Sequence, residues 1–373
     1  MKRDPVYVAR PSLPPLEEVL PYLEQIWDTR ILSNNGPLLQ QFETALAAYL
    51  GVEHLSFVAN ATLGTVLAMQ QAGLTEGEVI TTPFSFVATA HAIRQAGCDP
   101  VFADIDPVTL NLDPAQVERL ITPRTRAILP VHVFGTPCDT EALADIARRH
   151  NLRLIYDAAH AFGVREADGG SVLRHGDMSV LSFHATKVFN TFEGGAVISH
   201  DRETKLGVDR LAAFGMRDAV TVEAIGTNAK MTEFAAAVGM AQLGHIDDML
   251  ARRAAVAHRY QAGLSGVTGL HCPGATGQPG HNHYAFPVMV GPDYPLSRDA
   301  LDRLLQSHDI FARRYFYPLI SEFEVYRDLP SSDPARLPHA QRAASRVLCL
   351  PMYPSLPPEV QDEIIALVAR PCG

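Results

Sequence analysis

One lysine stands just beyond the predicted end of a buried strand. The apolar run from Met178 to Phe183 is typical of a central strand, and Lys187 follows it ahead of the glycine pair at 194–195. Most lysines lie on exposed helices, whereas burial lowers the pKa of an amine and makes it a usable nucleophile toward an aldehyde. Lys187 is therefore either such a nucleophile or an ordinary loop lysine.

A carboxylate occupies a similar position on another predicted strand. Asp157 ends the apolar run 152–156 and is followed by small residues up to His160. An unpaired buried charge is very unfavourable, so this carboxylate needs a cationic partner or hydrogen bonds. No lysine or arginine lies beside it in the sequence, which leaves a protonated ligand nitrogen and backbone amides as the alternatives.

Two further turns after predicted strands have side chains suited to a ligand. The turn Asn60-Ala61-Thr62 precedes a helix, whose free N–H groups favour a phosphate, although Asn and Thr also cap ordinary helices. Phe86 follows another strand and either stacks on a flat ring or belongs to the core. In open α/β sheets, ligands bind beyond the carboxyl ends of the strands, so one shared site is expected.

Together these strand ends match the needs of pyridoxal 5'-phosphate. Lys187 offers an amine for its aldehyde, and Asp157 offers a carboxylate that keeps the pyridine nitrogen protonated. The 60–62 turn offers a phosphate site, and Phe86 offers an aromatic ring above the cofactor. A protonated pyridine ring can delocalise the electron pair that remains when an α-proton leaves. We therefore predict a pyridoxal-phosphate enzyme.

The elements that must position these residues alternate along the chain. Continuous apolar strands separated by helices predict an α/β fold, with a mostly parallel central sheet covered by helices. Asp113 and Asp139 stand where helix caps are expected. The predicted strands are 55–59, 79–82, 100–103, 127–131 and 152–156, and the helices between them are 62–72, 86–96, 114–121 and 140–150.

Changes in composition divide the chain into three predicted parts. Residues 1–37 form a proline-rich N-terminal arm with a helix at 16–27, residues 38–245 a large cofactor-binding domain, and residues 246–373 a smaller C-terminal α+β domain. A helix at 38–50 with Gly51 as its stop begins the large domain. Further along, we predict a long helical pattern at 232–264, a glycine- and proline-rich cluster at 274–280, strands at 284–290 and 347–350, and helices at 297–307, 339–345 and 357–369.

Composition also excludes several classes of protein. The 373 residues are 47% hydrophobic and 19% charged, which is typical of a globular protein with a large interior. A net charge of -10 without a basic cluster argues against nucleic acid and anionic membranes as partners. The start has no apolar signal segment and no apolar run approaches about 20 residues, so we expect a cytoplasmic protein. The five cysteines are scattered, so free buried thiols and no metal site are expected.

Several ordered motifs resemble the DegT/DnrJ/EryC1/StrS family of sugar aminotransferases, which are fold-type-I pyridoxal-phosphate enzymes. The resemblance covers nearly the whole chain and includes the segments around Asp157 and Lys187. The other motifs are Gly-Pro-Leu-Leu-Gln-Gln-Phe-Glu at 36–43, Pro-Val-Phe-Ala-Asp-Ile-Asp-Pro-Val-Thr-Leu-Asn at 100–111, Pro-Val-His-Val-Phe-Gly at 130–135, Gly-Thr-Asn-Ala-Lys-Met at 226–231 and Val-Leu-Cys-Leu-Pro at 347–351.

The resemblance implies a role for each site residue. Lys187 is then the lysine that bonds to the cofactor and moves protons, and Asp157 is the partner of the ring nitrogen. A related branch of dehydratases has His at the lysine position, which Lys187 argues against. Asn228 matches an asparagine that reaches the phosphate in the neighbouring subunit, which implies a homodimer. The remaining cofactor-binding residues implied are Ala61, Thr62 and Ser182 at the phosphate, Phe86 above the ring and His160 beside it.

Two departures from common family motifs narrow the expected substrate. Asn-Ala-Lys-Met at 228–231 replaces Asn-Tyr-Arg-Met, and Tyr-Phe-Tyr-Pro at 315–318 replaces His-Tyr-Pro-Pro. These variants are similar to the subgroup that aminates C4 of dTDP-4-keto-6-deoxyglucose to give dTDP-4-amino-4,6-dideoxyglucose, with glutamate as the expected donor. The alternatives are amination at C3, a UDP- or GDP-linked sugar, and a regulatory binder without turnover.

The residues that bind this substrate are harder to predict. A nucleotide diphosphate requires cations, and the candidates Lys230, Arg217, Arg313 and Arg314 are otherwise solvated surface residues. His184, His281 and His283 either face the cleft or lie in ordinary loops. We expect substrate contacts from His184, Lys230, Arg313 and Tyr315.

Overall fold

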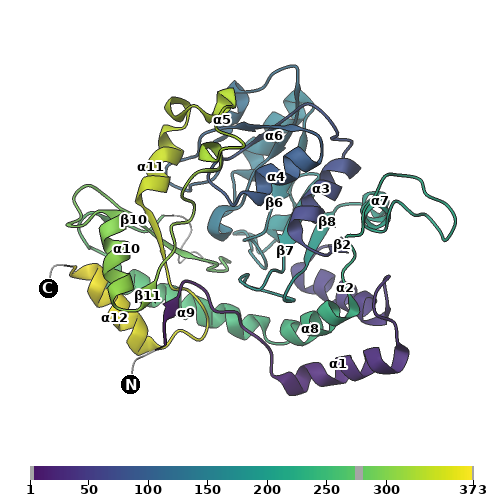
Figure 1. The fold of residues 1–373 in the computed structure, drawn as a ribbon, viewed down its shortest axis with the longest axis horizontal. Helices are drawn as coiled ribbons and strands as arrows, with labels where there is room; N and C mark the ends of the chain where they lie inside the picture. Colours follow the sequence, from purple (N-terminus) through teal and green to yellow (C-terminus); the bar gives the residue numbers. More distant parts are fainter. Residues whose placement is uncertain (1–3, 274–279, 372–373) are drawn as a thin grey trace.

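The computed structural model describes residues 4–273 and 280–371, and a seven-stranded sheet forms its centre (Figure 1). The strand order is β2-β8-β7-β6-β5-β3-β4, and among these strands only β8 runs antiparallel to its neighbours. The predicted α/β fold with a mostly parallel sheet is confirmed. The strands are β2 (His54–Val58), β3 (Glu78–Thr81), β4 (Asp99–Phe102), β5 (Thr125–Leu129), β6 (Arg153–Asp157), β7 (Met178–Ser182) and β8 (Gly195–Ser199).

Helices cover both faces of this sheet because its strands are apolar on both sides. Met178 and Val180 of β7 pack under helices α3, α4 and α7, whereas Leu181 faces helices α2 and α8. The predicted elements did not include α7, whose sequence is polar and contains Gly207. The helices are α2 (Pro37–Leu50), α3 (Ala61–Gln71), α4 (Ala88–Gln95), α5 (Pro114–Arg119), α6 (Thr140–His150), α7 (Arg202–Ala212) and α8 (Glu233–Leu243).

The N-terminal segment packs on the outside of the sheet domain through α1 (Leu16–Thr29), which lies along α8 (Figure 1). Behind it, the buried carboxylate of Glu233 accepts hydrogen bonds from the N–H groups of Leu38 and Leu39, at 2.9 and 3.0 Å. This side chain therefore caps α2 from a distant part of the sequence. Gly51 ends α2 in the left-handed conformation, as predicted.

The C-terminal part combines an antiparallel sheet of order β12-β10-β9 with flanking helices, which agrees with the predicted α+β composition. A short parallel pair, β1 with β11, joins the N-terminal segment to it. The domain boundary at residue 245 stays a prediction. The elements are β1 (Val6–Tyr7), α9 (Ile246–Leu264), β9 (Leu270–His271), β10 (Phe286–Val290), α10 (Arg298–Ser307), β11 (Ile310–Phe311), α11 (Pro338–Arg346), β12 (Val347–Leu350) and α12 (Pro358–Ala369).

The predicted helical pattern at 232–264 forms two helices, because α8 stops at Leu243 and α9 begins at Ile246, after Gly244. Within the described ranges, no helix is long and apolar enough to cross a bilayer. The described cysteines are free, with Cys272 only partly buried, whereas Cys372 and residues 274–279 of the predicted cluster lie outside the described residues. Short 3-10 turns occur at η1 (Val133–Gly135), η2 (Val172–Arg174), η3 (Ile320–Glu322), η4 (Pro330–Ser332) and η5 (Pro334–Arg336).

Candidate active site

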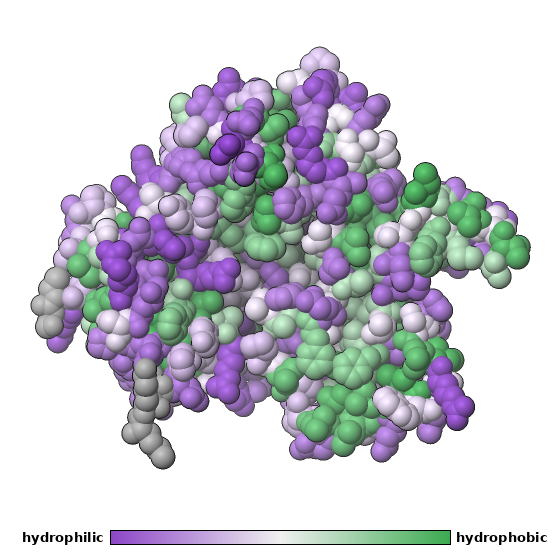
Figure 2. All heavy atoms as spheres, in the orientation of Figure 1, coloured by the Kyte–Doolittle hydropathy of each residue, from purple (hydrophilic) through white to green (hydrophobic). Residues whose placement is uncertain are grey.

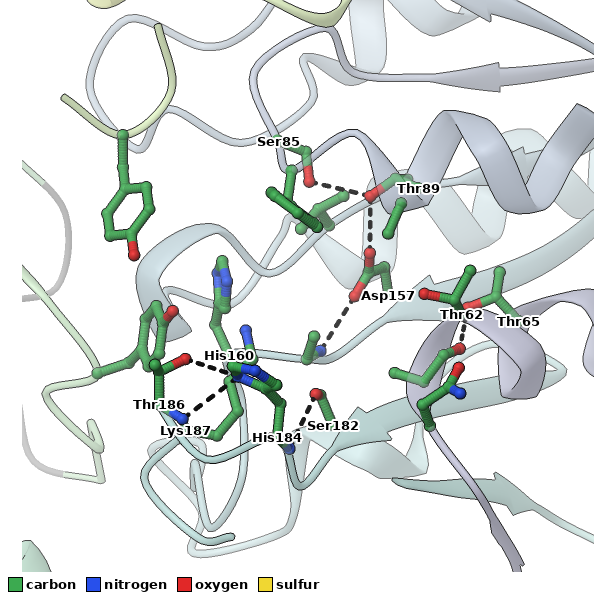
Figure 3. A pocket seen from close by; sticks show the side chains of 18 of the residues that line it. Thr62, Thr65, Ser85, Thr89, Asp157, His160, Ser182, His184, Thr186 and Lys187 are labelled. Carbon is green, nitrogen blue, oxygen red and sulfur yellow. Dashed lines mark hydrogen bonds between the residues drawn. The ribbon is translucent and has the colours of Figure 1, made fainter. Parts of the chain in front are cut away.

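A cavity of about 360 Å³ opens where the carboxyl ends of β6 and β7 meet the start of α3 (Figure 3). This is the edge of the sheet at which the sequence predicts a ligand. On the opposite side, aromatic residues of the C-terminal part close the cavity. The predicted site residues that line it are Ala61, Thr62, Phe86, Asp157, His160, Ser182, His184, Lys187, Arg313 and Tyr315.

Lys187 lies partly buried in the turn after β7, with its side chain in the cavity. Its backbone N–H donates to the carbonyl of His184 at 2.9 Å, and its Nζ lies 4.9 Å from the ring centre of Tyr284. Burial lowers the pKa of Lys187 from 10.5 to about 8, although the Asp157 carboxylate offsets part of this lowering. The amine is therefore suited to nucleophilic attack near neutral pH. This agrees with the prediction that Lys187 is a nucleophile and not an ordinary loop lysine.

Asp157 is held by hydrogen bonds from the protein and still faces the cavity (Figure 3). Its Oδ2 accepts from the hydroxyl of Thr89 at 2.8 Å, and its Oδ1 accepts from the N–H of Ala159 at 3.1 Å. Ser85 lies 3.0 Å from the Thr89 hydroxyl, and because Thr89 has one proton to give, Ser85 is the donor in that pair. Both oxygens have partners, and their free lone pairs can accept from a ligand N–H.

The start of α3 forms a cradle for an anion. Asn60 caps the helix by accepting from the N–H of Leu63 at 2.9 Å. Of the two alternatives for Asn60, a helix cap is therefore confirmed. The first helical N–H groups, those of Ala61 and Thr62, have no partner within the helix and lie at the positive end of its dipole. Gly195 permits this arrangement, because a Cβ there would lie 3.0 Å from the Ala61 nitrogen.

Two rings border the cavity in different ways. Phe86 is 60% exposed in the turn before α4, so the expectation that it belongs to the core is wrong and the ring is free to stack. His160 is buried and stacks on Tyr284 with 4.1 Å between ring centres. Its Nδ1 accepts from the N–H of Phe134 at 3.3 Å, and burial lowers the pKa of the ring well below 6.5. His160 is therefore neutral, with its proton on Nε2.

One buried amide joins the two sides of the cavity. The Nδ2 group of Asn282 donates to the carbonyls of His160 and Phe162 at 2.7 and 2.9 Å. Its Oδ1 accepts from the N–H of Tyr284 at 3.0 Å. Gly135 leaves room for this side chain, since a Cβ there would lie 2.5 Å from the Asn282 oxygen.

The structure does not bring every predicted residue into the cavity. Asn228 accepts a hydrogen bond from Lys230 Nζ at 2.8 Å, and neither residue lines the cavity of this chain. Arg217 pairs with Glu223 at 2.6 Å, so it is a surface residue as the alternative reading stated. The other expected candidates outside the lining are Arg314, which pairs with Asp299 and Asp302, and His281 and His283, which contact one another.

Several lining residues were missed from the sequence, and each had little local signal. Tyr284 begins an apolar segment that resembles plain core, and Thr89 lies inside a predicted helix. Glu193 precedes the glycine pair at 194–195, and it also lines the cavity.

These residues fit pyridoxal 5'-phosphate. An amine of lowered pKa, a hydrogen-bonded carboxylate and a helix start with free N–H groups lie around one cavity, and each suits a different group of that cofactor. The fold and the site thus define a pyridoxal-phosphate-dependent aminotransferase. The chain belongs to the DegT/DnrJ/EryC1/StrS aminotransferase family, whose model matches residues 16–369.

Comparisons with known proteins identify several relatives. The chain is 50% identical to the dTDP-4-amino-4,6-dideoxy-D-glucose transaminase of Shigella dysenteriae, over 98% of each chain. It is 44% identical to the Escherichia coli protein of the same name, over 97% of each chain. Its fold matches DesI, crystallised in the presence of its TDP-sugar product, with a TM-score of 0.92 and 38% identity over 99% of this chain and 94% of DesI.

Proposed function

We propose that this aminotransferase moves the amino group of L-glutamate to C4 of dTDP-4-keto-6-deoxyglucose, giving dTDP-4-amino-4,6-dideoxyglucose. Two relatives named for the 4-amino sugar, at 50% and 44% identity over nearly the full chain, support this substrate. The observation that carries the chemistry is Lys187, whose amine has a pKa of about 8 in the same cavity as the Asp157 carboxylate.

The roles of the residues at the base of the cavity follow from their surroundings. The cofactor, when bound, supplies a ring that withdraws the electron pair released with the α-proton. The carboxyl group of Asp157, oriented by Thr89 and Ala159, would pair with the ring nitrogen and favour its protonated form. The neutral Nζ of Lys187 removes the α-proton of the donor and later delivers a proton to C4 of the sugar.

The remaining cofactor contacts are assigned on the same grounds. The N–H groups of Ala61 and Thr62, together with the hydroxyl of Ser182, bind the phosphate, because the positive helix end favours an anion. Phe86 would stack on the pyridine ring, and neutral His160 would border the ring without adding charge.

The open side of the cavity receives the nucleotide sugar. The guanidinium of Arg313 lies 5.1 Å from the ring centre of Tyr315, and no carboxylate in the described part of the chain pairs with it. A free cation on an aromatic platform at the cavity mouth suits a diphosphate. We assign Arg313 to that group and Tyr315 to the sugar or nucleotide next to it.

We further propose that the active unit is a homodimer in which Asn228 and Lys230 of one subunit reach the cavity of the other. Apolar side chains are exposed along α1 and in the segment after α7, where Figure 2 shows hydrophobic surface. Trp27 is 74% exposed and Ile225 is 93% exposed, which is unusual for side chains of this size. Analytical ultracentrifugation tests this proposal, and a monomer that is fully active would contradict it.

A cytoplasmic location is part of the same proposal. The free state of the described cysteines suits a reducing compartment. Fractionation of cells that produce the protein, with detection by antibody, tests this location, and recovery outside the cytoplasmic fraction would contradict it.

A panel of substrates tests the reaction itself. The protein is incubated with glutamate and dTDP-, UDP- and GDP-linked ketosugars, and NMR gives the position of the new amine. We expect turnover of the dTDP-linked 4-ketosugar and nitrogen at C4. Nitrogen at C3 or a preference for another nucleotide would overturn this substrate, and no turnover with any ketosugar would favour the regulatory alternative.

Reductive trapping identifies the lysine that holds the cofactor. The sequence has four lysines, at positions 2, 187, 205 and 230, so borohydride reduction followed by peptide mass spectrometry gives an unambiguous assignment. The cofactor mass is expected on the peptide that contains Lys187. Labelling at Lys205 or Lys230 instead would refute the role given to Lys187.

A further inference from the structure

An acidic residue lines a cavity that has to admit anions. Glu193 lines the cavity together with Lys187, and its side chain is 65% exposed. A diphosphate and the carboxylates of an amino donor would both be repelled by it. Its useful partners are therefore hydroxyl groups and amines.

The turn that contains Glu193 has a defined backbone conformation. Phe192 has a φ of 65°, a conformation that is strained for an aromatic residue, and the hydroxyl of Thr191 donates to the carbonyl of Glu193 at 2.8 Å. Gly194 is required beside them, because a Cβ there would lie 2.3 Å from the Thr191 hydroxyl oxygen. The local strain is offset by packing, since the ring of Phe192 stacks on Phe234.

His184 faces Glu193 in a defined tautomer. The N–H of Thr186 donates to His184 Nδ1 at 3.3 Å, so the proton of the neutral ring lies on Nε2. That nitrogen is 3.6 Å from Glu193 Oε1, which is too long for a hydrogen bond. A hydroxyl group can accept from the Nε2–H and donate to the carboxylate at the same time, and so it can bridge the two side chains.

The amino donor is the less suitable partner for this pair. Its amine must lose a proton before it can attack, and a neighbouring carboxylate would raise its pKa and so favour the charged form. The 4-ketosugar has one hydroxyl on the carbons next to the reacting carbon, the hydroxyl at C3, since C5 bears the methyl group and the ring oxygen, which has no proton to donate to a carboxylate. His184 and Glu193 line the same cavity as Lys187, and the His184 carbonyl accepts from the Lys187 N–H. The proposed proton transfer to C4 requires that carbon to lie near Lys187.

We propose that His184 and Glu193 bind the C3 hydroxyl of the ketosugar and so select 3-hydroxylated over 3-deoxygenated substrates. This inference rests on the proposed transfer to a 4-ketosugar. Glu193 accepts the hydroxyl proton in a hydrogen bond, and His184 donates to the hydroxyl oxygen. The pair recognises the sugar and takes no part in the reaction with the donor.

The test compares dTDP-4-keto-6-deoxyglucose with its 3-deoxy analogue. In the unaltered enzyme, we expect kcat/KM to be about 30-fold higher for the 3-hydroxy sugar, the value of one hydrogen bond to a charged group. In Glu193→Ala, kcat/KM for the 3-hydroxy sugar should fall by about the same factor. The 3-deoxy sugar should react as before, so the preference disappears. His184→Ala should reduce the preference in part.

The half-reaction with glutamate supplies the internal control. The rate of this half-reaction is measured from the loss of the visible absorption band of the lysine-bound cofactor. This rate should change less than about twofold in Glu193→Ala. Glu203→Ala, which removes an exposed carboxylate at the start of α7, should change neither half-reaction. Retention of the visible band in each variant shows that the site is folded.

Three outcomes would overturn the inference. These are an unchanged preference in Glu193→Ala, an equal loss with both sugars, and a slower reaction with glutamate. Failure of the proposed function is recognised separately, because the unaltered enzyme would then complete the glutamate half-reaction and accept neither dTDP-linked 4-ketosugar.

Discussion

The two sides of the cavity are built differently. On the side of the sheet, Asp157 has a hydroxyl and an amide donor, and Asn60 caps α3. On the side of the C-terminal part, the rings of Tyr284 and Tyr315 line the cavity, and Arg313 has no carboxylate partner among the described residues. The first side suits a cofactor that stays in place, and the second suits substrates that alternate.

Amino-acid substitutions should have different effects on the two sides of the cavity. Groups fixed by strands and hydrogen bonds hold one geometry, so a substitution of a group that acts on the cofactor should lower the rate of the reaction. Stacked rings and a free guanidinium accept ligands of several shapes, so a substitution there changes affinity. Substitutions on the sheet side, and then on the open side next to the C-terminal part, test this difference.

Removing the amine should have the largest effect. We expect Lys187→Ala to lower the overall rate by at least about 10⁴-fold, because both the covalent bond to the cofactor and the proton carrier are lost. The rate is measured with glutamate and the 4-ketosugar, beside the visible spectrum. Lys205→Ala, which alters a lysine paired with Glu43 and Asp209, is the control and should retain the band. Turnover of Lys187→Ala within tenfold of the unaltered enzyme would contradict its role.

Neutralising the carboxylate should have the next largest effect. Asp157→Asn keeps the size of the side chain and removes its charge, and we expect kcat to fall by about 10² to 10³-fold because the ring nitrogen loses its ionic partner. Ser85→Ala, which is one hydrogen bond further away, should cost less than about tenfold. Equal losses in the two variants would mean that the hydrogen-bonded chain matters more than the charge.

The pH dependence of cofactor uptake tests the burial of Lys187. The neutral amine is the reactive form, and with a pKa of about 8 its fraction rises as the pH increases and then levels off. Uptake of pyridoxal phosphate by the cofactor-free protein should therefore become about tenfold faster between pH 7 and pH 9. Stopped-flow absorbance measures this rate. A midpoint near 10.5, the value of an exposed lysine, would remove the case for a desolvated amine.

On the open side, Arg313→Gln should have the smallest effect. We expect the KM of the nucleotide sugar to rise about fivefold with kcat nearly unchanged, because one partly solvated contact to a phosphate is lost. The neighbouring Arg314→Gln is a matched control, since Arg314 already pairs with Asp299 outside the cavity. A lower affinity for the cofactor in Arg313→Gln would show that the two sides are not independent.

The strand ends could be predicted from the sequence because a strand buried on both faces is continuously apolar, so the polar residue after it stands out. Asp157 and Lys187 were found in this way, their chemistry indicated pyridoxal phosphate, and the family resemblance implied the same roles. Tyr284 could not be found by this reasoning, since its position depends on packing between segments far apart in the chain. Glu233 is a similar case, because its buried carboxylate caps a helix that begins almost 200 residues earlier.

The long helical pattern shows a different limit. Apolar residues recur at helical spacing on both sides of Gly244, so periodicity alone joins two helices that the structure separates. The direction of the second helix depends on its contacts with the C-terminal sheet, which local spacing does not encode.

The buried amide of Asn282 couples the two sides of the active site. This one side chain bonds the carbonyls of the turn after β6 and the amide of Tyr284, so it ties the sheet side of the site to the segment that carries Tyr284. Donor and acceptor use this cavity in turn, and a movement that separated the two segments would break the three hydrogen bonds of Asn282.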